Sequence, residues 1–152
     1  MTTKTDLDDP RITEFGLLIE ATRRLSRIVE ASLRDNHDLT MVEFEAMVRL
    51  GRSPDRQMSM SDMAGQMVLT SGGVTRLVDR LANEGYVERV SCPNDRRVQW
   101  ARLADEGVNR ITEALGTHLN DLDTHFFSAM SAEERSNVVP VLDRLRKACT
   151  TS

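Results

Sequence analysis

The sequence reads TSGGVTRLVDRLANEGYVER from residue 70 to residue 89, and this stretch predicts a helix followed by a short strand. Thr70 is a suitable N-cap, Gly85 favours the end of the helix, and residues 86–90 have the composition of a strand. Helical spacing gives an apolar face formed by Val74, Leu77, Val78 and Leu81. The opposite face is polar and consists of Gly72, Thr75, Arg76, Asp79 and Arg80. The apolar face is expected in the core, and the polar face is free to meet a partner.

Two adjacent glycines, Gly72 and Gly73, lie in the first turn of this predicted helix. Each costs a helix roughly 0.5 to 1 kcal/mol relative to alanine. Bare backbone at this position permits the close approach of another molecule. The glycine pair therefore favours a binding surface at the start of the polar face.

Residues 94–103 read NDRRVQWARL and predict the returning strand of a β-hairpin. From Val98 to Leu103, successive residues alternate between two faces, as they do in a strand. The predicted turn, residues 93–97, places Arg96 and Arg97 together at its tip. Asp95 precedes them, and we expect it to act as a counter-charge that orients Arg97.

Two shorter helices are predicted before this stretch. Thr40 and Glu43 have the spacing of a capping box and begin a helix over residues 41–52. Ser59, followed by Asp62, caps a second helix that ends near Met67. A short helix, a brief turn, a helix with a polar face and then a hairpin form a winged helix-turn-helix. In that motif the second helix enters the major groove of DNA, and a hairpin beside it lies over the minor groove, whose negative potential attracts arginine.

Long amphipathic helices are predicted on both sides of this motif. Residues 11–34 have apolar side chains at helical spacing, and so do residues 105–126 and residues 131–149. Ser131 and Glu134 form a second capping box, and Pro140 either kinks or divides the helix that follows. Because a chain of 152 residues has only a small lobe to cover these apolar stripes, we expect the surplus to meet a twofold mate.

The composition restricts the function. The chain carries 24 acidic and 20 basic residues and a formal net charge of -4, so any DNA contact must be local. Residues 70–103 hold six arginines and four acidic residues, and this is the locally basic part. Two cysteines without CxxC spacing, no signal peptide and no long apolar run predict a soluble cytoplasmic protein without membrane contact.

At these residues the chain resembles the MarR family of bacterial transcription regulators. The stretch at residues 70–89 is similar to the family's recognition helix and first wing strand, and residues 94–103 are similar to its wing signature. The resemblance extends over roughly residues 11–148. One departure is Ala104, where the family usually has a threonine that caps the next helix.

The resemblance implies a role for each DNA-binding candidate. Arg76 would contact base edges in the major groove, and Arg97 would enter the minor groove, held by Asp95. The remaining candidates would lie against bases or phosphates: Ser71, Gly72, Thr75, Arg80 and Arg96. It also implies a homodimer on a pseudo-palindromic operator and a repressor that is released by a small ligand, with aromatic acids as suggested ligands.

The predicted fold class is therefore mostly α (α+β), a winged helix-turn-helix lobe with a small β-hairpin wing plus long N- and C-terminal helices that form a dimerisation domain. The chain is treated as one MarR-like domain over residues 1–152. Residues 40–103 form the DNA-binding lobe, and residues 11–34 and 105–149 form the dimerisation helices. No cofactor, catalytic residue or metal is expected, since the nucleophile elbow, the Walker lysine and the HExxH pattern are all missing.

Several alternatives remain open at the level of sequence. The paired arginines at the turn can be solvated surface charges, and Arg76 and Arg80 can pair with Asp79, Asp62 or Glu84. Three side chains share one helical face and are candidate zinc ligands: His118, Asp121 and His125. Cys92 is a candidate oxidant sensor, and the methionines at positions 41, 47, 58, 60, 63 and 67 either fill the core or line a ligand cavity. The alternative function is a helical ligand- or protein-binding module that has lost DNA binding.

Overall fold

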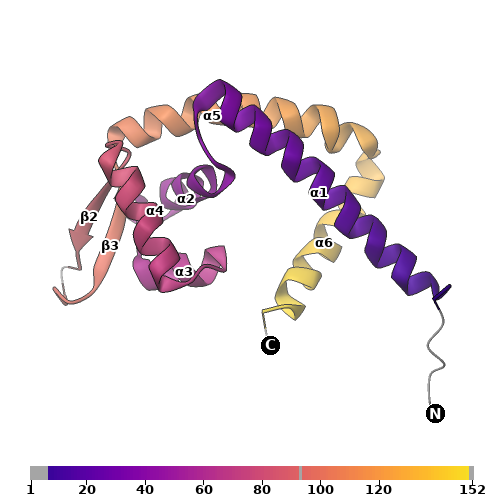
Figure 1. Ribbon diagram of the computed structural model, residues 1–152, viewed down its shortest axis with the longest axis horizontal. Coiled ribbons are helices and arrows are strands. Elements are labelled where there is room, and N and C mark those ends of the chain that lie inside the picture. Colours follow the sequence, from indigo (N-terminus) through magenta and orange to yellow (C-terminus); the bar gives the residue numbers. More distant parts are fainter. Residues whose placement is uncertain (1–6, 93, 151–152) are drawn as a thin grey trace, which may run out of the picture. The chain divides into compact units, whose positions relative to one another are not determined.

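The computed structural model describes residues 7–92 and 94–150. Figure 1 shows the elements in chain order: α1 (Pro10–His37), α2 (Met41–Arg52), η1 (Pro54–Arg56), β1 (Gln57–Ser59), α3 (Met60–Met67), α4 (Ser71–Asn83), β2 (Val87–Ser91), β3 (Gln99–Leu103), α5 (Asp105–His125), η2 (Phe127–Ala129) and α6 (Ala132–Ala148). The chain divides into two compact units, Met1–Val29 with Leu119–Ser152 and Glu30–His118. We call the first the helical unit and the second the lobe. The lobe contains all of residues 40–103, which the sequence predicted to bind DNA. It also includes the end of α1 and the first part of α5.

The predicted capping residues begin the helices that they were expected to begin. In α2 the Thr40 side chain accepts from the Glu43 N–H at 3.2 Å, and the Glu43 carboxylate accepts from the Thr40 N–H at 2.8 Å. The same reciprocal pair, Ser131 and Glu134, begins α6. Ser59 caps α3 and Thr70 caps α4, each by accepting the backbone N–H of the residue three positions on, Asp62 and Gly73. All four predicted helix starts are confirmed.

The hairpin is part of a three-stranded antiparallel sheet with the strand order β1-β3-β2. Val90 pairs with Trp100 and Arg89 with Ala101, which confirms the predicted hairpin of β2 and β3. Pro93, which belongs to the predicted turn, lies outside the described residues. The third strand, β1, was not predicted, because three residues are too few to show alternation. It adds to the free edge of β3, where Met58 pairs with Ala101.

The core of the lobe is built from the apolar faces that the sequence predicted. The four apolar residues of α4, at positions 74, 77, 78 and 81, are at most 2% exposed. Met47, Met58, Met63 and Met67 are buried and Met41 and Met60 are half-buried, so the methionines act chiefly as core residues. Figure 1 shows α2, α3 and α4 gathered beside the hairpin. The polar face of α4 is thereby held on a packed support.

The start of α5 lies against the corner between α4 and β2. The Ala104 N–H donates to the carbonyl oxygen of Tyr86 at 2.9 Å. A side chain at Gly107 would collide with the same carbonyl oxygen and would lie 2.7 Å from Leu103 Cδ1. Glycine is therefore needed at position 107 for this close approach. The first turn of α5 also contains Asp105, whose carboxylate accepts from Arg56 Nη1 at 3.0 Å.

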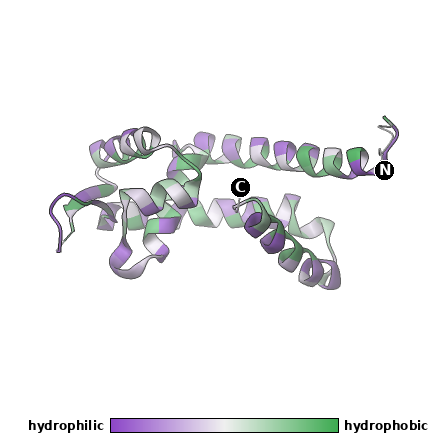
Figure 2. Cartoon of the chain, turned by 90° about the horizontal axis from the view of Figure 1, so that it is seen from below, coloured by the Kyte–Doolittle hydropathy of each residue, from purple (hydrophilic) through white to green (hydrophobic). Residues whose placement is uncertain are grey.

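The helical unit has few buried side chains. The helix α6 runs through Pro140 without being divided, and none of its residues is buried. Figure 2 shows green and purple segments alternating along α1. The exposed apolar side chains of the unit include Ile12, Phe15, Leu17, Leu18, Leu119, Val139, Val141, Leu142 and Leu145. Within residues 7–92 and 94–150, no helix has both the length and the apolar character that crossing a bilayer requires.

Candidate nucleic-acid interface

The polar face of α4 is open to solvent. Ser71, Gly72, Thr75 and Arg76 are all exposed. The Thr75 hydroxyl donates to the carbonyl oxygen of Ser71 at 3.0 Å, so its proton is used within the helix and its oxygen is left to accept. Among the described residues, the Arg76 guanidinium has no ion-pair partner. It therefore presents its full set of donors to an incoming anion or base edge.

Arg80, also on α4, has a partner that the sequence did not predict. Its Nε lies 2.9 Å from Oε1 of Glu43, whereas the candidate partners considered from sequence were Asp79, Asp62 and Glu84. Glu43 is 7% exposed and belongs to the first turn of α2. The side chain of Arg80 remains 56% exposed, so one edge is fixed by protein and the rest faces solvent. Arg80 is thus a structural side chain that still offers donors at the surface.

Asp79 is the acidic residue of the polar face, and it is neutralised from the neighbouring strand. Its Oδ1 accepts from Arg89 Nε at 3.1 Å and from Arg89 Nη2 at 2.6 Å. The pair connects α4 to β2, because Arg89 lies in the first strand of the hairpin. The alternative that the sequence left open, in which Asp79 pairs with Arg76 or Arg80, is not the arrangement found in the structure. The actual pairing leaves Arg76 free and reduces the repulsion that Asp79 would exert on a phosphate.

The wing turn is closed by hydrogen bonds from the backbone. Asp95 Oδ1 accepts from the backbone N–H of Arg97 at 3.0 Å, and the Asp95 carbonyl accepts from the Val98 N–H at the same distance. The expected counter-charge role of Asp95 toward the Arg97 side chain is therefore replaced by a contact to its backbone. The guanidinium groups of Arg96 and Arg97 are exposed and form no ion pair within the described part of the chain.

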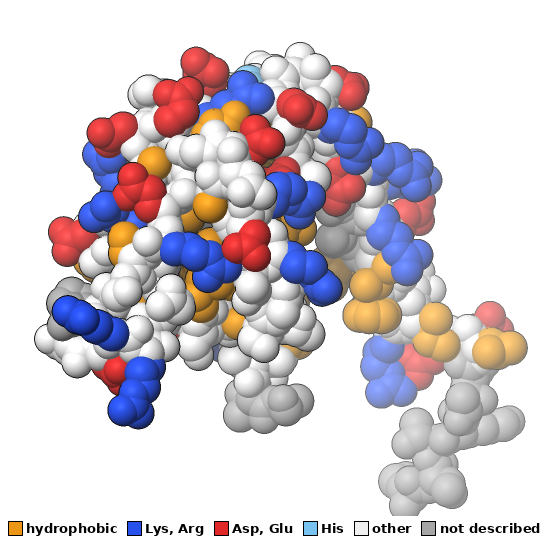
Figure 3. Space-filling model, turned by 60° about the vertical axis from the view of Figure 1, so that its left-hand side comes forward, with side chains coloured by type: hydrophobic (Ala, Val, Ile, Leu, Met, Phe, Trp, Pro, Cys, Tyr) orange, Lys and Arg blue, Asp and Glu red, His pale blue; other side chains and the backbone are white. Residues whose placement is uncertain are grey.

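Several other arginines of the lobe are held in ion pairs, among them Arg49 with Glu45 and Arg56 with Asp105. Figure 3 shows basic and acidic side chains interspersed on the face in view. Arg102 and Glu88 form a further ion pair on the hairpin, 2.6 Å apart. The free cations at the polar face of α4 and at the wing tip are available to a polyanion, and among the described residues of the lobe Arg34 and Arg52 are also exposed without an ion pair.

The candidate zinc ligands do not form a metal site. The part of the chain that the structure describes contains no group of three or more His, Cys, Asp or Glu side chains able to hold a metal ion. The ring of His118 instead packs on Phe44, with centroids 4.6 Å apart. Cys92 is half-buried, Cys149 is exposed, and both are free thiols. Nothing in these contacts singles out Cys92 as a sensor.

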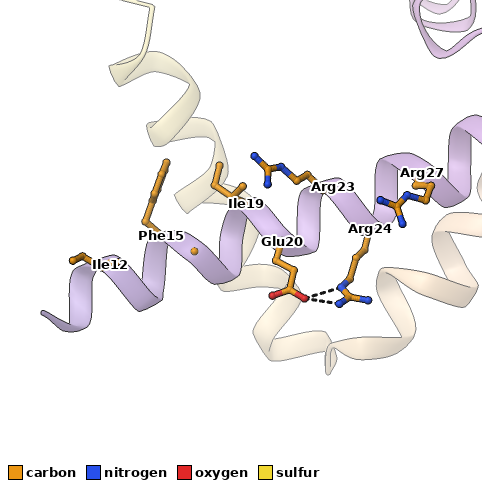
Figure 4. A pocket seen from close by; sticks show the side chains of 8 residues that line it. Ile12, Phe15, Ile19, Glu20, Arg23, Arg24 and Arg27 are labelled. Atoms are coloured by element: carbon orange, nitrogen blue, oxygen red, sulfur yellow. Dashed lines mark hydrogen bonds and ion pairs between the residues drawn. The ribbon is translucent and has the colours of Figure 1, made fainter. Parts of the chain in front are cut away.

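The surface grooves formed by the described residues include two that have apolar side chains in their lining. One has a volume of about 450 Å³ and lies in the lobe, where its lining includes Met41, Phe44, Val48, Arg52 and Met58. The other has a volume of about 600 Å³ and follows α1. Figure 4 shows Phe15 and Ile19 projecting from one side of α1 in this second groove, with Glu20 joined to Arg24.

Comparison with known proteins agrees with this geometry. A sequence model of the MarR family matches residues 39–98, which extend from the start of α2 to the wing. The HTH-type transcriptional regulator MhqR of Bacillus subtilis is 27% identical over 109 residues, which cover 72% of this chain and 73% of that protein. Residues 39–98 are a MarR family domain. This family consists of transcription regulators, and the prediction that the chain is not an enzyme agrees with the match.

Solved MarR family structures have the same fold. AbsC from Streptomyces coelicolor gives a TM-score of 0.90 at 23% identity, over 98% of this chain and 100% of that chain. A second MarR family regulator from Streptomyces coelicolor, crystallised with DNA, gives 0.88 at 23% identity, over 97% of this chain and 92% of that chain. The predicted fold class is therefore confirmed as the MarR fold, mostly helical with a small antiparallel wing.

Proposed function

We propose that this MarR family protein is a transcriptional repressor that binds operator DNA as a homodimer and is released by a small ligand. The observation that carries the proposal is the pair of free cationic sites on one lobe, Arg76 on α4 and Arg96 with Arg97 on the wing. Arg76 stands on a helix whose exposed first turn carries two glycines, and the wing arginines stand on the neighbouring hairpin. A helix and a hairpin with these charges fit adjacent grooves of a duplex.

Each side chain has a role in this complex. Arg76 reads base edges in the major groove, where a guanidinium pairs with the O6 and N7 acceptors of guanine. Ser71, Gly72 and Thr75 lie against bases or phosphates, and the outer donors of Arg80 hold a phosphate. Arg97 enters the minor groove, with Asp95 fixing the backbone from which it projects. The Asp79–Arg89 pair holds helix and wing together, so both engage at once.

The homodimer is supported by the apolar surface of the helical unit. Phe15 is 64% exposed, Val139 is 57% exposed, and α6 buries no residue at all within the described chain. Exposed apolar side chains in such number favour an interface, and a twofold axis is the commonest solution for identical chains. Two lobes then bind half-sites about one helical turn, roughly 34 Å, apart.

Release by a ligand follows from linkage. A molecule that binds better to the form of the dimer with lower DNA affinity must weaken DNA binding by the same factor. The groove of the lobe supports such a ligand, because it combines apolar lining residues, Phe44 and Met58, with the exposed cation Arg52. This lining fits a flat molecule with a negative charge, such as an aromatic acid.

The test is selection of an operator from random duplex DNA by the purified protein, with the mass of the complex measured by sedimentation. We expect an inverted repeat and two chains bound to each duplex. Selection of no duplex would instead favour the alternative, a helical binding module without DNA affinity. Selection of an asymmetric site by a single chain would remove the dimer from the proposal.

A further inference from the structure

Val68, in the turn between α3 and α4, has an unusual backbone conformation. Its φ is 55° and its ψ is 43°, which is the left-handed region. The other non-glycine residues with positive φ in the described chain are Asp38, Asp55 and Arg56. Val68 is the only β-branched residue among the four. A branched Cβ crowds the backbone in this region, so valine is a costly choice here.

The conformation is required by the end of α3, whatever the side chain. The Val68 N–H points back to the carbonyl oxygens of Ala64 and Gly65, and the Leu69 N–H donates to Ala64 at 2.9 Å. These bonds form the left-handed cap with which many helices end, and glycine adopts it without strain. The valine side chain therefore strains the backbone at a position where glycine would be favoured.

Burial does not compensate for this strain. The side chain of Val68 is 91% exposed, the highest value for a large apolar residue of the lobe. Val42 and Val98, the other exposed large apolar residues of residues 38–118, are 40% and 39% exposed. A single exposed valine needs no explanation by itself, but an exposed valine in a strained backbone gains nothing from folding. Its benefit must come from a partner.

The position of Val68 points to the nature of that partner. It is two residues before Thr70, the N-cap of α4, and the exposed first helical residues Ser71 and Gly72 come directly after that cap. A protein partner would need an apolar patch, and Val68 is the one large apolar side chain that is exposed among residues 60–92, since Met67 is buried and Leu69 is half-buried. In the major groove of DNA, the apolar group on a base edge is the C5 methyl of thymine.

We propose that Val68 is a specificity-determining residue that contacts a thymine methyl group at the edge of each half-site. This inference rests on the proposed function, because it assigns a contact within the same DNA complex. The left-handed backbone holds the side chain at the entrance to the polar face of α4. The strain is retained because the methyl contact is made only in the complex, which is typical of strained residues at functional sites.

The test uses the operator selected by the unaltered protein and a set of duplexes in which each thymine is replaced in turn by uracil, which removes only the methyl group. At one symmetric position, the loss of the methyl should weaken binding of the unaltered protein by roughly threefold to tenfold. Val68→Gly should bind the parent operator more weakly by a similar factor and should no longer respond to that uracil. Its Tm should rise, because glycine relieves the strain.

Asp38→Gly is the matched control, since Asp38 is also exposed and has a φ of 50°. It should keep the affinity and the full uracil response. If Val68→Gly retains the same uracil response as the unaltered protein, the methyl contact is wrong and the side chain serves a protein partner. If the unaltered protein selects no operator, the proposed function fails and this inference with it. If the protein selects an operator but no single replacement of thymine by uracil weakens binding, the Val68 contact is refuted and the proposed function stands.

Discussion

The Nε atom of Arg80 lies 2.9 Å from Oε1 of Glu43, and this contact joins helix α4 to the first turn of α2. The other oxygen of the same carboxylate, Oε2, accepts from the N–H and the hydroxyl of Thr40, both at 2.8 Å. One nearly buried carboxylate therefore closes the cap of α2 and fixes the orientation of α4 at the same time. The carboxylate of Glu43 therefore helps to position the polar face of α4 from the side of α2.

Glu43→Gln should reduce the free energy of unfolding by about 1–2 kcal/mol, because the amide leaves Arg80 without its anion and weakens the cap at Thr40. Glu45→Gln is the matched control on the same helix. Glu45 pairs with Arg49 at 2.6 Å on a partly exposed surface, and its loss should cost less than about 0.5 kcal/mol. Urea denaturation followed by circular dichroism measures both. Equal losses in the two variants would show that the Glu43 contact has no special role.

Gly107→Ala should destabilise the lobe by about 1–3 kcal/mol, because the added methyl group meets the Tyr86 carbonyl and a Leu103 methyl, and backbone cannot move aside as a flexible side chain can. Gly116→Ala, on the same helix, meets nothing within 4 Å and should stabilise it by up to about 1 kcal/mol. Thermal unfolding of the two variants therefore gives shifts of opposite sign. A rise in Tm for Gly107→Ala would contradict the close approach.

Local signals made most of the fold predictable. The caps at Thr40, Ser59, Thr70 and Ser131 depend on residues three positions apart, so they are visible in the sequence and all four begin a helix. The apolar face of α4 is equally local. The strand β1 was missed because its formation depends on the free edge of β3, more than forty residues away in the chain. Whether Pro140 divides the last helix also required the structure, since sequence alone allowed both outcomes.

The sequence predicted which residues belong to the candidate site, but it did not predict the contacts between them. Arg76 and the wing arginines are exposed as expected, yet the partners of Arg80 and Asp79 were not found from sequence. Glu43 had been assigned only as a cap, and Arg89 only as a strand residue. The sequence gives little indication that Glu43 pairs with Arg80. The two residues lie on different helices, and the distance between them is set by tertiary packing.

The cap of α6 should depend on pH. Hydrogen bonds from the Ser131 backbone and side chain hold the pKa of Glu134 below its usual range. Since the folded pKa is lowered, the cap contributes fully above the unfolded pKa and is lost as pH falls through the lower folded value. In an NMR titration Glu134 should therefore have a midpoint below that of an unfolded peptide. Ser131→Ala removes the hydroxyl and should raise this pKa part of the way back. Identical midpoints in the protein and the peptide would contradict the cap.

Arg97→Ala should weaken operator binding by roughly 1–3 kcal/mol, because it removes the guanidinium that the wing delivers to the minor groove. Since each phosphate neutralised by protein releases counterions, the affinity of the unaltered protein should fall steeply with added salt, and the slope for the variant should be smaller by about one. Arg144→Ala, an exposed arginine of α6, is the control and should change neither value. Fluorescence anisotropy with the selected operator over a series of salt concentrations measures affinity and slope together. Unchanged affinity in Arg97→Ala would remove the wing from the mechanism while leaving the role of α4 intact.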